Sequence, residues 1–401
     1  MNIGIASPIT IAAFIPFLDD KCKKKAKTIT GMKAPAVDTI AIEFIKQGHH
    51  VIIFTLDIEV NDHVHLYGNN VDIYVGSYVN RFWWKVGVFK YRRDEIQSLF
   101  HLNKIKLDII HAQWTREYAL AAKSLKNKVP VVVSVRDWQP VLLKNSNYSL
   151  SYLLLWLMDY IVFRTKNLYI VANSKYISER IKQRWGFKTV YFNNPISQSF
   201  FEKPLKTEIN ESVFTIITIS NGINPNKNID SLLKGYKEAR KYIGKSQLFL
   251  VGNDFVESNP NVIKWKTELL LEDCVLCGAA DRTRLINLLD SSDTLFHPSL
   301  EESFGNVLIE GLARGLHVIG GIYSGAVPYV LENGRLGSLC NIKDIHKIAE
   351  QIIDAYNNKK NNRLKAIEIS EYVKKIYSAN QIALNMTDFY KNCIINYENK
   401  Q

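Results

Sequence analysis

Short runs of β-branched and other apolar residues alternate along the chain with amphipathic stretches of helical period. In the first half, the apolar runs predict strands over residues 3–7, 51–56, 71–75, 109–111, 131–135, 169–172 and 189–192. The spacing of apolar positions between these runs predicts helices over residues 37–46, 118–125 and 175–184. Strands that alternate with helices in this way indicate an α/β fold, with a parallel sheet covered by helices on both faces.

The second half repeats this scheme, with strands predicted over residues 215–219, 248–251, 294–296 and 318–319. At 401 residues the chain is too long for one typical core. Asn193-Asn194-Pro195 marks the joint, because proline after two turn-forming residues ends the preceding strand. We therefore expect two Rossmann-like, doubly wound domains, residues 1–195 and 196–377, which face each other across a cleft and bind ligands at the carboxyl ends of their strands.

The positive charge of the chain is concentrated in its first half. The formal net charge is +12, and residues 1–195 carry 27 Lys or Arg against 15 Asp or Glu, while residues 196–401 carry 24 of each. This asymmetry predicts an anionic partner for the first domain, namely a membrane surface, a lipid diphosphate acceptor or nucleic acid. Nucleic acid is the least favoured of the three, because no recognition motif accompanies the charge.

Cysteine usage and the apolar segments indicate a cytoplasmic protein. Five cysteines are few and odd in number, which is typical of a reducing compartment, and the lone pair Cys274 and Cys277 does not make a metal site. The apolar start, residues 3–18, lacks a preceding basic residue, so we interpret it not as a secretion signal but as a first strand, residues 3–6, that enters a loop. Residues 152–163 are too few to span a bilayer. Any membrane contact is expected to be peripheral, at the inner face.

Two carboxylates flank a predicted helix start in the second half. Residues 304–314 have helical periodicity, so Glu302 falls in the loop before this helix and Glu310 in its second turn. The unpaired amides of the helix start, around Ser303, Phe304, Gly305 and Asn306, form an anion site at the positive end of the helix dipole. A diphosphate bound there would place sugar hydroxyls beside each carboxylate. This arrangement predicts binding of a nucleotide-diphosphate sugar.

The segment from Glu302 to Glu310 resembles the Glu-seven residues-Glu signature of the family 4 retaining glycosyltransferases, and residues 311–319 resemble its continuation into helix and strand. The alternative is a solvated helix face with two unrelated carboxylates. The resemblance implies the two-domain GT-B fold, with acceptor bound mainly by residues 1–195 and donor by residues 196–377. It also implies that the tail, residues 378–401, forms a helix over about 381–394 that crosses back onto the first domain.

The resemblance extends to Lys227, which is predicted to lie in a turn-rich loop between a strand and a helix that begins near Asp230. The family has a lysine here, where the cation would stabilise the diphosphate leaving group. The alternative is a solvated loop lysine. Gly222 departs from the family, which often has an arginine at that place. Donor phosphates would then depend on Lys227, the helix amides or an arginine from elsewhere in the chain.

Three segments of the first domain also resemble the family. Gly31 precedes a predicted helix in the loop whose backbone approaches the donor phosphate in the family, although an ordinary loop is an equal alternative. His111 and the pair Arg136-Asp137 follow strands that line the acceptor side. The family often has histidine where Arg136 stands, and arginine suits charge stabilisation or an anionic acceptor. His111 either hydrogen-bonds substrate or is simply packed, and Asp137 is a candidate acceptor contact.

Two basic segments of the first domain are candidate membrane surfaces. Residues 21–27 contain five lysines, and residues 81–93 mix Lys and Arg with tryptophan, phenylalanine and tyrosine. Cations together with large rings suit anionic lipid headgroups, although such runs also occur as solvated loops and paired tryptophans in cores.

The resemblance implies a hexosyl transfer with retention from a nucleotide sugar to a saccharide or a polyprenyl-diphosphate-linked glycan, as in surface polysaccharide biosynthesis. Because no close pair of carboxylates suggests a nucleophile, we expect substitution on one face of the sugar, with the leaving phosphate taking the acceptor proton. Glu302 would hold hydroxyls of the transferred sugar and Glu310 those of the ribose, and no metal cofactor is expected. The alternatives are a sugar-nucleotide epimerase, a phosphorylase, or a catalytically idle subunit that supports a membrane-associated transferase.

Overall fold

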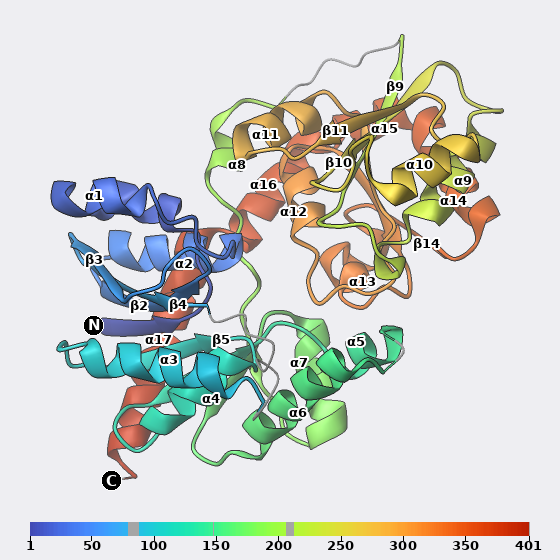
Figure 1. Ribbon diagram of the computed structural model, residues 1–401. Coiled ribbons are helices and arrows are strands. Elements are labelled where there is room, and N and C mark those ends of the chain that lie inside the picture. The colour runs from blue at the N-terminus through green and yellow to red at the C-terminus, as the bar shows by residue number, and fades with distance from the viewer. Residues whose placement is uncertain (79–87, 147, 206–211, 401) are drawn as a thin grey trace. The chain divides into compact units, whose positions relative to one another are not determined.

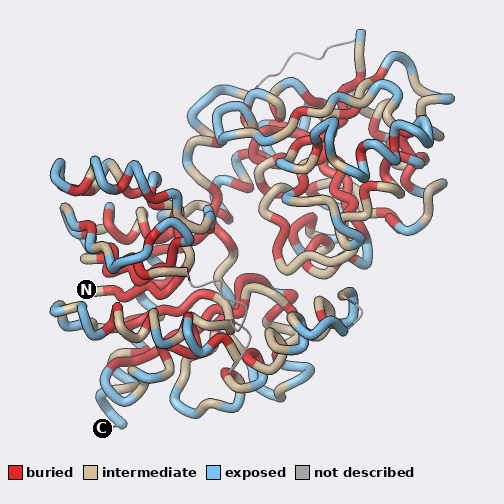
Figure 2. The backbone as a smooth tube through the Cα atoms, in the orientation of Figure 1, coloured by how far each residue is buried: buried red, intermediate tan, exposed pale blue. Residues whose placement is uncertain are grey.

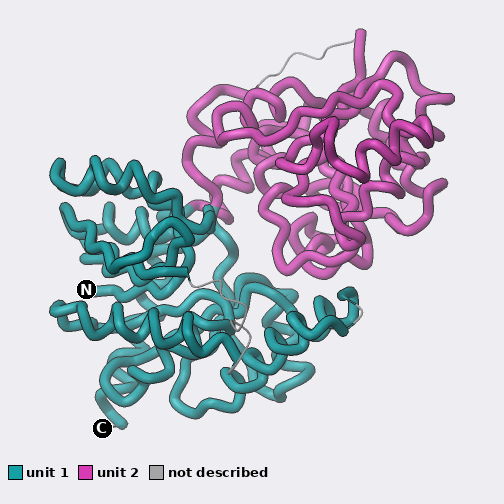
Figure 3. The backbone as a smooth tube through the Cα atoms, viewed as in Figure 1, with its two compact units in different colours: residues 1–195, 379–401 teal, residues 196–378 magenta. Residues whose placement is uncertain are grey.

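The computed structural model describes residues 1–78, 88–146, 148–205 and 212–400. These residues form two compact units: unit 1 comprises residues 1–195 together with 379–401, and unit 2 comprises residues 196–378 (Figure 3). The chain passes from unit 1 to unit 2 directly after Pro195, at the turn-forming Asn193-Asn194-Pro195 segment. It returns at Ser378, and the last helix therefore belongs to unit 1.

Unit 1 contains, in the described residues, a sheet of eight strands in the order β3-β4-β2-β1-β5-β6-β7-β8. All neighbouring strands are parallel except β3 and β4, which are antiparallel. The strands are β1 (Asn2–Ala6), β2 (His50–Asp57), β3 (Val64–Gly68), β4 (Val71–Ser77), β5 (Ile109–Gln113), β6 (Val131–Val135), β7 (Tyr169–Ala172) and β8 (Val190–Tyr191).

Helices cover both faces of this sheet (Figure 1). They are η1 (Ile11–Phe17), α1 (Asp20–Ala26), α2 (Pro35–Lys46), α3 (Lys90–Leu102), α4 (Glu117–Ala122), η2 (Lys123–Leu125), α5 (Gln139–Asn145), α6 (Leu150–Arg164), α7 (Lys175–Trp185) and α17 (Ala379–Glu398), where η denotes a 3-10 helix. Helix α17 packs beside α2, and Tyr390 enters the same apolar core as Phe44.

Unit 2 has a six-stranded, all-parallel sheet in the described residues, in the order β11-β10-β9-β12-β13-β14. The strands are β9 (Phe214–Ile219), β10 (Ser246–Val251), β11 (Cys274–Gly278), β12 (Thr294–His297), β13 (His317–Gly321) and β14 (Ser338–Cys340). The helices are α8 (Ser199–Glu202), η3 (Pro225–Lys227), α9 (Ile229–Ala239), α10 (Pro260–Thr267), α11 (Arg282–Asp290), α12 (Asn306–Ala313), α13 (Val327–Val330), η4 (Glu332–Gly334), α14 (Ile345–Asn357), α15 (Lys359–Leu364) and α16 (Ala366–Ile376).

The buried residues follow the sheets and the inward faces of the helices (Figure 2). The predicted α/β fold with two parallel sheets is confirmed. The sequence interpretation omitted β3, β11 and β14, which are short or lie at or beside a sheet edge, where the alternation of apolar and polar residues is weak. None of the helices in the described ranges is both long and apolar enough to cross a membrane.

Candidate functional site

Glu302 and Glu310 flank the start of helix α12. Glu302 lies in the loop after β12, and Glu310 lies in the second turn of α12. The helix is preceded by Gly305, whose φ of 90° is a left-handed conformation that favours glycine. Helix α12 is shorter than the predicted range, yet each carboxylate lies in the element that the spacing predicts. The flanking arrangement is therefore a property of the local sequence.

The Glu302 carboxylate is held by two neighbouring side chains. Lys227 Nζ donates a hydrogen bond to Glu302 Oε1 at 2.8 Å, and His297 Nε2 lies 3.2 Å from the same oxygen. Burial would raise the pKa of Glu302, but the hydrogen bond with His297 and the charge of Lys227 hold that pKa well below its usual range. The carboxylate is thus ionised at neutral pH, and neither partner occupies Oε2.

Lys227 reaches Glu302 because two loops of unit 2 are bonded to each other. Lys227 ends helix η3, and Asn228 after it has a left-handed φ of 52° before α9 begins. Leu300 N–H donates to the carbonyl of Asn226 at 2.8 Å, and Asn226 Nδ2 donates to the carbonyl of Glu301 at 3.1 Å. These bonds hold the loop after β9 against the loop after β12, which is what brings the lysine to the carboxylate.

A third loop, after β13, supports the backbone of Glu302. Ala326 N–H donates to the Glu302 carbonyl at 2.8 Å. Gly325 has a φ of 58°, and a Cβ there would lie 2.3 Å from the Glu302 carbonyl oxygen, so a larger residue would push the two loops apart. Loops from three strands therefore meet at Glu302, at the carboxyl edge of the unit 2 sheet, where open parallel sheets bind ligands.

Glu310 is in a different electrostatic environment from Glu302. Burial raises the pKa of Glu310 to about 7, and the charge of Arg282 at the start of α11 only partly offsets this. At neutral pH this carboxyl group is therefore close to half protonated. A hydrogen-bonding ligand that prefers the carboxylate form would complete its ionisation.

Phe304, between the two carboxylates, can contribute its backbone but not its side chain to an anion site. The Phe304 side chain is only 2% exposed and packs on Tyr377 with ring centroids 5.8 Å apart. Sequence reasoning included Phe304 among donor-binding residues, and the structure limits that role to its amide. Ser303, Gly305 and Asn306 lie around the helix start as predicted.

His111 is part of the unit 1 core. It is 1% exposed, its Nδ1 lies 2.5 Å from the Tyr390 hydroxyl of α17, and its Nε2 lies 2.8 Å from Ser134 Oγ. Burial, together with the charge of Arg136, lowers the pKa of His111 to about 3, so the ring is neutral. Because both ring nitrogens have protein partners, the structure supports the packed interpretation of His111 over substrate contact.

Arg136 follows β6 and is fixed by neutral groups. Its Nε donates to Gln113 Oε1 at 2.7 Å, its Nη1 donates to Asn194 Oδ1 at 2.7 Å, and its guanidinium lies 5.5 Å from the Trp114 ring. Burial lowers the pKa of Arg136 to about 10. In the described part of the chain no carboxylate is hydrogen-bonded to it, because neighbouring Asp137 accepts instead from Arg116 at 2.6 Å. Among the described residues, Arg136 is thus a cation with neutral hydrogen-bond partners, and the nearby charge of Asp137 offsets only part of the effect of burial on its pKa.

Gly31 lies at the carboxyl edge of the unit 1 sheet but its amide is occupied. Gly31 N–H donates to Asp57 Oδ2 at 2.6 Å, so this amide is not available to a phosphate. The predicted phosphate contact of this loop would need another group. Gly31 does line a cavity of about 750 Å³ in unit 1, together with Lys33, Trp114 and Arg116. This cavity brings basic and aromatic side chains together on the predicted acceptor side.

The structure describes the first of the two basic segments in full and the second only in part. Residues 21–27 lie mostly in α1, where Cys22 and Ala26 face inward and the lysines face solvent. Residues 79–87, which hold the two tryptophans of the second segment, lie outside the described residues. Arg92 of that segment is only 6% exposed, with its guanidinium 3.7 Å from the Tyr78 ring centroid, so it is not part of a basic surface.

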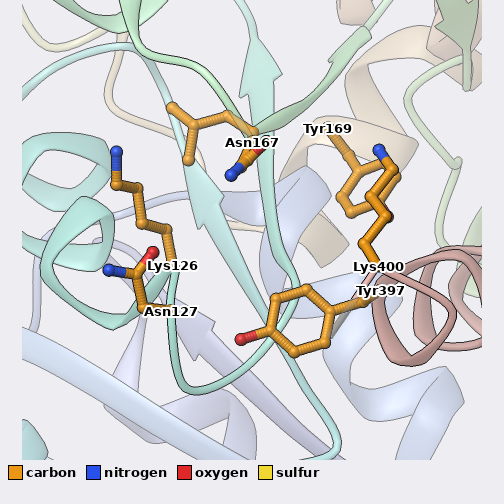
Figure 4. A pocket seen from close by; sticks show the side chains of 7 residues that line it. Lys126, Asn127, Asn167, Tyr169, Tyr397 and Lys400 are labelled. Atoms are coloured by element: carbon orange, nitrogen blue, oxygen red, sulfur yellow. The ribbon is translucent and has the colours of Figure 1, made fainter.

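A second cavity in unit 1 lies at the opposite edge of the sheet. It measures about 330 Å³ and is lined by side chains that precede β6 and β7 and by the end of α17 (Figure 4). Lys126 and Asn127 lie across it from Tyr397 and Lys400 (Figure 4). It contains none of the residues that the sequence singled out for chemistry.

Sequence reasoning missed His297 and Arg282 as members of the site. In the sequence, His297 stands at the end of an apolar run, and Arg282 belongs to no motif. Their signals are positional, because His297 ends the strand before Glu302 and Arg282 begins a helix. Cys274 and Cys277 both lie on β11 and are free thiols.

The chain is similar in sequence and in fold to known proteins. Residues 36–197 match the family model described as Glycosyltransferase Family 4, and residues 200–373 match the model described as Glycosyl transferases group 1. The chain is 26% identical over 297 residues to N-acetyl-alpha-D-glucosaminyl L-malate synthase of Bacillus anthracis, an alignment that covers 71% of this chain and 74% of that protein.

The fold is similar to solved structures along nearly the whole chain. Sucrose-phosphate synthase from Thermosynechococcus elongatus has a TM-score of 0.76 at 15% identity, covering 99% of this chain and 100% of that chain. HepE of Anabaena, in complex with UDP and glucose, has a TM-score of 0.66 at 13% identity, covering 98% of this chain and 100% of that chain. These likenesses confirm the predicted fold of two Rossmann-like units.

Proposed function

Because the chain belongs to the family 4, group 1 glycosyltransferases, we propose that it moves a hexosyl group from a nucleotide-diphosphate sugar to a hydroxyl of a saccharide or lipid-linked glycan, with retention of configuration. The single observation that supports this most is the Glu302 carboxylate, bonded to Lys227 and His297 beside the start of α12. This arrangement brings a fixed anion, a fixed cation and helix amides together at the carboxyl edge of the unit 2 sheet.

In this proposal the donor lies along the carboxyl edge of the unit 2 sheet. The diphosphate takes the amides around Phe304 and Gly305 and the ammonium of Lys227, which exchanges part of its contact with Glu302 for phosphate oxygens. Glu302 Oε2 accepts hydrogen bonds from hydroxyls of the transferred sugar, and Glu310 accepts them from the ribose. HepE, a structural neighbour described in complex with UDP and glucose, supports a donor of this class.

In the proposed transfer of the hexosyl group, the charges of Lys227 and Glu302 stabilise the reacting groups. The bond between the sugar anomeric carbon and the phosphate oxygen breaks, and the acceptor oxygen bonds to that carbon on the same face. The departing phosphate oxygen takes the proton of the acceptor hydroxyl. Lys227 stabilises the negative charge that develops on the phosphate, and ionised Glu302 stabilises the positive charge that develops on the sugar ring. Since these charges are supplied by the chain, we propose that no metal is needed.

On the acceptor side, we propose that Arg136 binds an anionic group. A half-buried cation with neutral hydrogen-bond partners is costly to keep unless it serves a ligand. The similar Bacillus anthracis protein is named for a product that contains malate, a dicarboxylic acid, which supports an anionic acceptor. A phosphate of a polyprenyl-diphosphate-linked glycan would suit the same guanidinium. Such an acceptor places the protein at the inner face of a membrane, in surface polysaccharide or glycan biosynthesis, a location with which the free thiols agree.

The test is nucleotide binding followed by nucleotide release. In a thermal-shift screen, one class of uridine or guanosine diphosphate sugar should raise the unfolding temperature of the full chain. That sugar nucleotide should then be consumed slowly by water and faster with acceptor. Binding without any nucleotide release would instead support an idle subunit, and no shift with any sugar nucleotide would contradict the donor site.

The role of Arg136 has its own readout. Arg136→Gln should lower kcat/KM for an anionic acceptor such as a uronic acid at least about tenfold, while the matched neutral hexose changes little. Lys104→Gln, which removes an exposed cation of the same unit, is the control. An equal loss of kcat/KM for charged and neutral acceptors would contradict the proposal that Arg136 binds an anionic acceptor.

A further inference from the structure

Helix α6 of unit 1 carries apolar side chains on its solvent-facing side as well as on its core-facing side. In the sequence of this helix, the only acidic residue is Asp159. Asp159 is 3% exposed and is buried together with Met158 and Val162. Met158 and Val162 pack in the unit 1 core, as the inner face of a surface helix normally does, but the outer face of such a helix is normally polar. The outward face of α6 therefore requires an explanation other than packing within this chain.

The exposed side chains of α6 form one continuous stripe. Leu150 is 60% exposed, Leu153 43% and Tyr160 37%, and partly exposed Trp156 lies between them. Leu153, Trp156 and Tyr160 follow one another at intervals of three and four residues, so they lie on the same side of the helix. This stripe ends at Arg164, the last residue of α6.

Helix α7 extends the stripe with further aromatic rings. Trp185 at its end stacks on Phe163 with ring centroids 4.8 Å apart and lies 5.7 Å from the Tyr160 ring. Phe187, which follows the helix, is 37% exposed. The two helices thus share one apolar and aromatic surface within unit 1; their labels α6 and α7 mark its place in Figure 1.

Positive charge surrounds this aromatic surface. Residues 164–188 contain seven Lys or Arg and one Glu. Arg164 donates to the Tyr160 hydroxyl at 3.2 Å, and its guanidinium lies 5.5 Å from that ring. Lys166, Arg184 and Lys188 are exposed, and the Arg184 guanidinium lies 6.0 Å from the Trp185 ring. Cations with long apolar stems beside tryptophan and tyrosine suit the boundary between lipid headgroups and acyl chains.

We propose that this surface, made of Leu150, Leu153, Trp156, Tyr160, Trp185 and Phe187 with the cations of residues 164–188, binds to the surface of an anionic phospholipid bilayer. Helix α6 has 15 residues, about 22 Å at 1.5 Å per residue, which is shorter than a hydrocarbon core of about 30 Å. The helix therefore lies in the interface plane and does not cross it. This inference gives the proposed membrane-side function a docking surface, separate from the basic segments noted in the sequence.

Charge distinguishes a bilayer from a protein partner here. A second copy of this chain would bring the same cations, Arg164 and Arg184 beside the rings, to the same face, and like charges would repel. An anionic lipid surface attracts each basic residue by about 1 kcal/mol, which is about fivefold in binding.

Vesicle co-sedimentation of the full chain tests the proposal. Vesicles of phosphatidylcholine with phosphatidylglycerol should bind the chain, and vesicles of phosphatidylcholine alone should bind it at least about tenfold more weakly. Leu153→Glu should reduce binding to the anionic vesicles at least about tenfold. The double change Lys166→Glu with Lys188→Glu should reduce it by about 25-fold or more, because two attractions are lost.

Two matched controls lie on unit 2. Leu364→Glu changes a leucine that is 82% exposed, and Lys241→Glu with Lys245→Glu changes two exposed lysines. Both should bind vesicles like the unchanged chain. Equal binding to neutral and anionic vesicles, or full binding by Leu153→Glu, would overturn the proposal. A dimer in light scattering that Leu153→Glu abolishes would overturn it in favour of a second copy.

Nucleotide release from a soluble donor separates this proposal from the proposed function. Leu153→Glu should release nucleotide at the rate of the unchanged chain, because Leu153 belongs to neither the donor site nor the residues around Arg136. Vesicle binding without any nucleotide release would leave the docking surface intact and contradict the transferase assignment. Nucleotide release without vesicle binding would do the reverse.

Discussion

Glu310→Gln is expected to stabilise the empty protein while it weakens nucleotide binding. Burial raises the pKa of Glu310 from 4.5 in the unfolded chain to about 7 in the folded protein. The folded protein therefore holds the proton across that interval. The stabilisation from this group is complete below pH 4.5 and is lost as the pH rises through about 7. Glutamine cannot ionise, so the variant avoids that loss.

The magnitude follows from the two pKa values. A change from 4.5 to about 7 corresponds to about 3 kcal/mol of free energy of unfolding. The side chain is partly exposed, and solvent screening reduces this to about 1–2 kcal/mol. The Glu310→Gln change should weaken nucleotide binding, because hydrogen bonds from ribose hydroxyls to a carboxylate contribute about 1.5–3 kcal/mol. The variant should therefore bind the donor nucleotide about tenfold to a hundredfold more weakly.

Urea titration and calorimetric binding measure the two effects separately. The stability advantage of Glu310→Gln should be small near about pH 5 and should reach its full value above about pH 7. Nucleotide affinity of the unchanged protein should rise between about pH 6 and about pH 8, as Glu310 ionises, and that of the variant should stay flat. Opposite signs for stability and binding are typical of a group retained for function.

Glu371→Gln provides the control, since Glu371 is an exposed carboxylate of the same unit. It should change neither the free energy of unfolding nor the affinity by more than experimental scatter. A Glu310→Gln protein with undiminished affinity for every sugar nucleotide would refute the assignment of Glu310 to the donor. A variant that is less stable than the unchanged protein above pH 7 would refute the account of its pKa.

Three further changes test the surrounding structure. Glu302→Gln should lower transfer at least about a hundredfold in a nucleotide-release assay. Because the folded pKa of Glu302 is depressed, its stabilisation is present above about pH 4.5 and lost in acid, and urea titration at neutral pH should show a loss of about 1–3 kcal/mol. Gly325→Ala should cost about 1–3 kcal/mol and reduce transfer, since the new Cβ meets the Glu302 carbonyl; equal activity would contradict the loop contact. Tyr390→Phe should lower stability by about 1–3 kcal/mol by leaving His111 Nδ1 without its partner, with kcat/KM within about twofold; a large loss of kcat/KM would favour a substrate contact by His111.

Much of the fold could be predicted because its elements are encoded locally. The strands of both sheets are short apolar runs, and the helices between them have clear periodicity. The strands that the sequence did not predict are β3, β11 and β14. They lie at or beside sheet edges, where the pattern of apolar and polar residues is weaker. The last helix runs from Ala379 to Glu398, longer than the predicted range 381–394, since helix ends depend on packing as well as on period.

The sequence by itself determined that Glu302 and Glu310 would flank a helix start. Glu310 stands eight positions after Glu302, and Gly305 and the start of the helical pattern lie between them. Only the tertiary structure decided what each carboxylate touches. Lys227 reaches Glu302 across 75 residues of chain through bonded loops. Tyr390 reaches His111 across 279 residues and makes a candidate substrate ligand into a core residue. The sequence also did not determine which side of α6 faces solvent. Exposure depends on which elements pack against a helix, and those elements come from distant parts of the chain.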